Sequence, residues 1–273
     1  MIHCSSFRDF ARTAGRPALR AGTAAFVAAG LLAASPLASH AQTPTRVMVR
    51  VASHDAKIIG SGVGGARVTI RDQRTGSVLA EGIQEGGTGN TSLLMGTRER
   101  GASVYDTEGA AGFMAELELS EPTWVVVSAE GPLGTPDQLR HASTTTLLIP
   151  GRDVVGDGIV LELLGFTVEL REPAQDAVLP AGESVDVLAR VTMLCGCPTS
   201  PGGIWDSDGY EIVARVMRDG ALMSETPLSF TGENSMHSAE IPAMDAGEVT
   251  IEVLSIDEAR GNFGLARSNF TVR

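Results

Sequence analysis

VDVLARVTM, residues 185–193, is the clearest alternation of apolar and polar residues in the chain. Val185, Val187, Ala189, Val191 and Met193 place an apolar side chain at every second position, and three of the four residues between them are polar. Successive side chains of a strand point to opposite faces of a sheet. The alternation therefore predicts a strand with one face on a core.

Shorter runs of the same kind recur from residue 47 to the end of the chain, separated by glycine, proline and polar turn residues. No long window shows sustained apolar spacing of the helical kind. The predicted strands include 47–51, 68–70, 113–119, 124–129, 144–149, 159–164, 212–216, 249–253 and 270–272. Many short strands separated by turns are typical of all-β sandwiches or barrels. Because the pattern begins a second cycle near Phe166, we expect two tandem β-sandwich domains, residues 42–166 and 167–273.

The first half carries a family resemblance. GGARVTIRD at 64–72, followed by TGSVLAEG at 75–82, resembles the opening hairpin of carboxypeptidase-regulatory-like or transthyretin-like domains. Such domains usually continue with a Thr-Asp-x-x-Gly turn, which residues 83–90 replace here, and a long insertion follows to about Ala111. The resemblance implies a β-sandwich scaffold and no catalytic residues.

The second half resembles another scaffold family. GEVTIEV at 247–253, Asp257, the Gly261-Asn262 pair and FTV at 270–272 are similar to the last hairpin of bacterial immunoglobulin-like domains. This resemblance again implies a β-sandwich, and it names no activity.

The first 41 residues have the order of a secretory signal peptide. A leader with four arginines precedes the apolar run 24–34, and Ser39-His40-Ala41 places small residues around a cleavage point. The apolar run is too short to span a bilayer, and no cysteine follows it to carry a lipid. We expect a bacterial protein that starts at Gln42, is periplasmic or secreted, and has no membrane insertion after cleavage.

The charge of the chain limits its partners. The formal net charge is −12, and cleavage of the leader would make it more negative, because four arginines and one aspartate would be lost. An acidic surface repels phosphate backbones, so we expect no nucleic-acid partner. A protein or cell-envelope ligand remains, and the sequence leaves the oligomeric state open.

Catalytic motifs are missing from the pattern of residues. No nucleophile elbow, zinc-protease helix or Ser/His/Asp spacing occurs. Residues 60–65 match G-x-G-x-x-G, but the alternating stretch 66–70 follows where a dinucleotide site needs a helix. We therefore expect a protein that is not an enzyme and that has no catalytic or cofactor-binding residues.

Two loop regions have alternative interpretations. The segment 86–112 lacks periodicity, and Arg98 and Arg100 within it suit an anionic group, although a solvated loop without structure of its own is the favoured interpretation. The pair Asp153 and Asp157, and the acidic cluster 206–209, suit Ca²⁺, but neither has the spacing of a dedicated calcium loop. Asx turns explain the acidic residues equally well.

The most suggestive chemical motif is Cys195-Gly196-Cys197, which follows Met193 at the end of the clearest predicted strand. The two cysteines continue the parity of that strand's core-facing residues. Three alternatives stay open: an oxidised or buried structural pair, a Cu or Zn site formed with Met193 and Met236-His237, and a redox-active dithiol.

Taken together, the sequence predicts an exported, non-enzymatic binding or accessory module built from two β-sandwich domains. The alternative is a periplasmic protein that handles a soft metal such as copper through Cys195, Cys197 and Met193.

Overall fold

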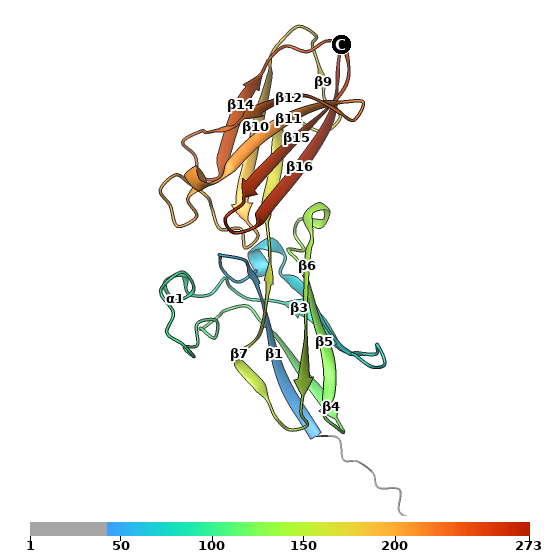
Figure 1. Cartoon of the computed structure of the whole chain (residues 1–273), viewed down its shortest axis with the longest axis vertical. Coiled ribbons are helices and arrows are strands. Elements are labelled where there is room, and N and C mark those ends of the chain that lie inside the picture. Colours follow the sequence, from blue (N-terminus) through green and yellow to red (C-terminus); the bar gives the residue numbers. More distant parts are fainter. Residues whose placement is uncertain (1–42) are drawn as a thin grey trace, which may run out of the picture. The chain divides into compact units, whose positions relative to one another are not determined.

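The computed structural model describes residues 43–273, and strands form almost all of their regular structure (Figure 1). The expected leader, residues 1–41, lies outside the described residues. Within residues 43–273, no helix is long and apolar enough to cross a membrane. The helical pieces are α1 (Thr91–Leu94) and three single 3-10 turns, η1 (Ser61–Val63), η2 (Pro136–Gln138) and η3 (Ser207–Gly209).

The first sandwich packs a three-stranded sheet against a four-stranded sheet. In the three-stranded sheet, of order β4-β1-β7, the central strand runs antiparallel to β4 and parallel to β7. The four-stranded sheet, of order β3-β2-β5-β6, is antiparallel throughout. The strands are β1 (Thr43–Ser53), β2 (Ala66–Asp72), β3 (Val78–Gln84), β4 (Phe113–Leu119), β5 (Thr123–Gly131), β6 (Arg140–Leu148) and β7 (Val154–Leu163).

The second sandwich has the sheet order of an immunoglobulin fold. One sheet has the order β13-β14-β10-β8 and the other the order β12-β11-β15-β16-β9. Strands β8, β10, β14 and β13 correspond to A, B, E and D on one sheet, and β11, β15 and β16 correspond to C, F and G on the other, with β12 added beside C as in variable-type domains. The strands are β8 (Phe166–Glu172), β9 (Val178–Leu179), β10 (Val185–Met193), β11 (Glu211–Arg218), β12 (Ala221–Pro227), β13 (Ser229–Phe230), β14 (Met236–Ile241), β15 (Gly247–Asp257) and β16 (Asn262–Val272).

Each sandwich buries its own cluster of aliphatic side chains. Residues 185–193 form β10, and their five alternating apolar side chains are all buried, as the period-2 pattern predicts. The prediction of an all-β fold with two tandem sandwiches is therefore confirmed.

Sequence reasoning did not identify the strands β9, β12, β13 and β14. Strand β12 lies at the edge of its sheet, and almost all of its residues are exposed. An edge strand with little buried surface has no reason to alternate between apolar and polar residues, so periodicity could not reveal it.

Candidate functional site

The insertion between β3 and β4, residues 85–112, has a folded structure of its own. Its helix α1 is capped by Asn90, whose Oδ1 accepts the main-chain N–H of Leu93 at 3.2 Å. The apolar residues of the insertion form a third buried cluster with the end of β1 and the segment after it, made of Ala52, Ile58, Leu94, Val104, Tyr105 and Ala111. The interpretation of this segment as a solvated loop without structure of its own is therefore wrong.

A buried arginine from the central strand β1, Arg50, supports the insertion. The side chain of Arg50 is only 3% exposed, although it lies on a strand whose other buried residues are mostly apolar. Its Nη1 donates to the carbonyl oxygen of Ala111 at 2.8 Å, and its Nη2 donates to the Asp106 carboxylate at 2.7 Å and to the carbonyl oxygen of Gly156 at 3.4 Å. One guanidinium therefore ties β1, β7 and the insertion together.

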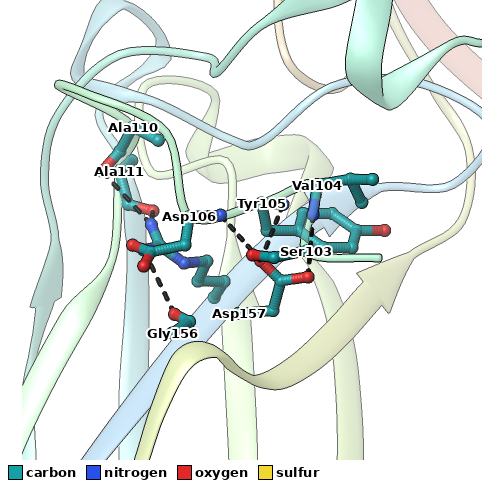
Figure 2. A network of polar contacts seen from close by, with 9 residues as sticks. Ser103, Val104, Tyr105, Asp106, Ala110, Ala111, Gly156 and Asp157 are labelled. Atoms are coloured by element: carbon teal, nitrogen blue, oxygen red, sulfur yellow. Dashed lines mark hydrogen bonds and ion pairs between the residues drawn. The ribbon is translucent and has the colours of Figure 1, made fainter. Parts of the chain in front are cut away.

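The carboxylate of Asp157, on β7, also holds the insertion in place. Figure 2 shows Asp157 facing residues 103–106, where its oxygens accept the hydroxyl of Ser103 at 2.6 Å and the main-chain N–H groups of Val104, Tyr105 and Asp106 at 2.7–2.9 Å. Successive amides that converge in this way form a natural anion site, and here a side chain of the same chain fills it. Burial raises the pKa of Asp157, but these hydrogen bonds lower it more, so the pKa lies below its ordinary value.

Two glycines place Asp157 in this position. The pairing of β1 with β7 slips between Val47 and Val49, and the bulged segment of β7 contains Gly156, Asp157 and Gly158. Gly158 has φ +69°, and a Cβ there would lie 2.2 Å from the carbonyl oxygen of Met48. Only glycine fits that position, so the Gly-Asp-Gly sequence marks the bulge that turns the carboxylate toward the insertion.

The acidic pairs considered for Ca²⁺ have other partners. Asp153 accepts the main-chain N–H and the guanidinium of Arg46 at 2.7–2.9 Å, and these contacts lower its pKa. Asp206 accepts N–H groups of its own turn. Among residues 43–273, no group of three or more His, Cys, Asp or Glu side chains is arranged to hold a metal ion.

Of the two arginines of the insertion, Arg98 is held by contacts within the fold. Arg98 donates to the carbonyl oxygen of Leu94 at 3.0 Å and to the hydroxyl of Tyr105 at 3.3 Å, and its guanidinium lies 5.2 Å from the Tyr105 ring centre. Arg100 is exposed among residues 96–103, which are all exposed. We call residues 96–103 the crest of the insertion. The contacts of Arg50 and Asp157 hold the segments on either side of the crest.

The sulfur motif lies where β10 reverses its direction. Cys195 and Cys197 are joined in a disulfide, with their α carbons 5.4 Å apart. The turn is closed by the Gly196 N–H, which donates to the Met193 carbonyl at 2.8 Å, and by the Met193 N–H, which donates to the Cys197 carbonyl at 3.1 Å. The side chains of Met193, Cys195 and Cys197 are buried in the core cluster of the second sandwich. The side chain of Leu194, which follows Met193 in the sequence, is buried in the core cluster of the first sandwich. With both sulfurs bonded to each other, a soft-metal site is a prediction for the reduced protein only.

The remaining candidate ligands, Met236 and His237, lie on β14. His237 pairs with Ala189 of β10, is 2% exposed, and makes an edge contact with the ring of Phe230 at 5.8 Å. Burial lowers its pKa. His237 therefore lies in the core as a neutral side chain.

Sequence reasoning missed Arg50 and Asp106. The available signal was Arg50 itself, a charged residue inside the apolar run of β1, and the two glycines around Asp157.

No family model and no curated protein sequence matches the chain. Among solved structures, it is similar to fibronectin(III)-like modules of CbhA from Clostridium thermocellum, with 14% identity over 84% of this chain and 94% of that one and a TM-score of 0.27. Titin domains z1z2 in complex with telethonin match with 16% identity over 85% and 96%, at a TM-score of 0.25. An engineered protein matches at 16% identity and a TM-score of 0.31, over 46% of this chain and only 24% of that one. Likenesses with TM-scores below 0.5 support no conclusion about function.

Proposed function

We propose that the protein is an exported, non-enzymatic binding or accessory module whose recognition element is the crest, residues 96–103. In this proposal, residues 1–41 are a cleaved signal peptide that delivers the chain to the periplasm or the medium. Residues 42–166 form a carboxypeptidase-regulatory-like domain, and residues 167–273 form an immunoglobulin-like domain.

One observation supports the proposal most strongly: a buried charge and a hydrogen-bonded carboxylate hold the base of an exposed loop. Burying an arginine costs free energy unless its donors are paired, and both terminal nitrogens of Arg50 donate to the insertion and its neighbours, whereas its buried Nε has no partner among the described residues. Long loops held on a rigid scaffold are where binding residues concentrate. The described structure therefore favours a role for the crest outside the fold itself.

The composition of the crest indicates the kind of ligand. It contains Arg98, Glu99 and Arg100 between small residues, and Leu93 beside it is 44% exposed. Charges of both signs next to one apolar side chain suit the polar rim and small apolar centre of a protein interface. The ligand that we propose is a protein or another component of the cell envelope.

The test compares crest variants in a sedimentation assay with purified envelopes of the producing cells. Leu93→Ser combined with Arg100→Glu changes exposed side chains only and leaves Arg50 and Asp157 in place. Arg152→Glu is the matched control, because it makes the same charge change at an exposed position of the same sandwich. We expect the wild type and the control to sediment with envelopes and the crest variant to stay in solution. Equal sedimentation of all three proteins, or of none, would contradict the proposal.

A further inference from the structure

A second surface of the first sandwich carries the most exposed aromatic side chain of residues 43–273. Trp124, at the start of β5, is 56% exposed, whereas the other tryptophan, Trp205, is 7% exposed. Within the described residues, the indole N–H of Trp124 has no hydrogen-bond partner. An indole is large and apolar, and its single donor usually finds a partner when the ring is covered. Trp124 thus presents both a flat apolar face and a free donor.

Two turns hold the surroundings of this indole in place. The turn after β2 is tied to β5 because the main-chain N–H of Gln73 donates to the Trp124 carbonyl at 2.9 Å. Asp72 closes the same turn by accepting the N–H groups of Arg74 and Thr75 at 2.7 and 2.8 Å. The turn before β5 is closed by the Thr123 hydroxyl, which donates to the Glu121 carbonyl at 2.9 Å. Hydrogen bonds therefore fix the main chain on both sides of Trp124.

The indole and the two turns line an open hollow of about 480 Å³, bounded by Asp72, Gln73, Arg74, Glu121, Pro122, Thr123 and Trp124. Within residues 43–273, the side chains of Gln73, Arg74 and Glu121 make no hydrogen bond to the rest of the protein. The volume lies within the range of small-molecule sites. Arg50 and Asp157 have their hydrogen bonds inside the fold, whereas these groups are available to a ligand.

The chemical groups that line this hollow suit one class of ligand better than others. An apolar protein anchor does not suit a rim of carboxylate, amide and guanidinium groups, because these groups would lose water without gaining a partner. A cation on the indole would meet Arg74 at the rim, and one Asp72 oxygen already accepts two amides of its own turn. A pyranose ring fits better: its C–H face packs on an indole, and its hydroxyls donate to and accept from planar side chains such as Gln, Glu and Arg.

We propose that Trp124 and the turns 72–74 and 121–123 form a saccharide-binding site with the indole as its platform. The site goes beyond the proposed role of the crest, because it lies on the four-stranded sheet, while the crest is supported by β1 and β7 of the other sheet. The loss of one site therefore leaves the other in place.

Tryptophan fluorescence tests the site, because Trp124 is exposed and Trp205 is buried. The exported protein is titrated with cellohexaose, with the hexamer of N-acetylglucosamine and with maltohexaose, and binding is checked by calorimetry. We expect at least one of these sugars to shift the emission in a saturable way. Trp124→Ala should raise the Kd by about thirtyfold, since truncation of a central aromatic anchor costs that much in other interfaces. Trp124→Phe, which keeps a smaller aromatic face, should fall between the two.

Phe263→Ala is the matched control, because this aromatic side chain is 51% exposed in the second sandwich, and it should leave the Kd unchanged. The crest variant should also bind the sugar as wild type does, which separates a failure of this site from a failure of the crest. Binding of none of the three sugars would overturn the proposal, as would equal binding by Trp124→Ala. Quenching of Trp124 by an oligolysine peptide without any sugar binding would assign the platform to cations instead.

Discussion

The two sandwiches differ in how each holds one of its irregular segments in place. In the first, residues 85–112 are attached by directional contacts from a buried guanidinium and a carboxylate. In the second, the five-residue turn 193–197 is closed by two main-chain hydrogen bonds and a disulfide, and its apolar side chains are buried in the cores. The short turn therefore needs only its own main-chain bonds and side chains buried in the cores, whereas the long insertion combines an apolar cluster with polar groups from distant strands that specify one conformation.

The largest expected effect comes from removing the buried charge of the first sandwich. Arg50→Met keeps the aliphatic bulk of the side chain but leaves the carbonyl of Ala111 and the carboxylate of Asp106 without their donor. We expect the free energy of unfolding to fall by about 2–4 kcal/mol, measured by urea denaturation.

Arg46→Met is the control for that measurement. Arg46 lies on the same strand and pairs with Asp153, but its side chain is 59% exposed. The loss there should stay below about 1 kcal/mol. Equal losses of unfolding free energy in Arg50→Met and Arg46→Met would show that the burial of Arg50 adds nothing to stability.

The disulfide of the second sandwich should matter less than Arg50. A bridge between residues two apart closes so short a loop that it restricts the unfolded chain only slightly. We expect the double variant Cys195→Ser, Cys197→Ser to lose less than about 2 kcal/mol in the same denaturation series. A loss as large as that of Arg50→Met would remove the contrast between the two sandwiches. Stoichiometric Cu(I) uptake by the reduced wild type, but not by the double variant, would instead revive the metal alternative.

The smallest expected effect is the loss of stability that His237 causes at acidic pH. Burial lowers the pKa of His237, so the folded protein stays neutral at this position where the unfolded chain, with a pKa of about 6.5, takes up a proton. The free energy of unfolding is therefore highest above about pH 6.5, and it decreases as the pH falls from there toward the lowered pKa of His237. We expect urea titrations between about pH 7 and pH 5 to show a slope of at most about 1.4 kcal/mol per pH unit from this group.

The variant His237→Phe should flatten that slope, because phenylalanine keeps a ring beside Phe230 and cannot titrate. His141→Gln, at an exposed position, should leave it unchanged. If the slope persists in His237→Phe, another group of the core must titrate in its place.

The sequence allowed prediction of the scaffold more fully than of the insertion. Period-2 patterns such as Val185 to Met193 locate strands because each buried face must be apolar along its whole length. The insertion obeys no such period: its position depends on Arg50 and on Asp157, which meet residues about 50 to 60 positions away in the chain. Spacing alone could not pair them, and Asp157 was instead grouped with its neighbour Asp153.

The saccharide platform was missed for a related reason. Trp124 sits inside an alternating run and was counted only as part of a strand. Its role depends on a turn more than 40 residues earlier, where the Gln73 N–H donates to its carbonyl. Exposure of that indole, at 56%, is a property of the folded sheet and not of the local pattern.

Hydrogen exchange of three amides reports directly whether residues 85–112 form a folded element that Asp157 holds in place. The N–H groups of Val104, Tyr105 and Asp106 all donate to Asp157. We expect these amides to exchange slowly in the wild type and much faster in Asp157→Ala, while the amides of β10 keep their protection in both proteins. Exchange of the three amides at unprotected rates in the wild type would contradict the account.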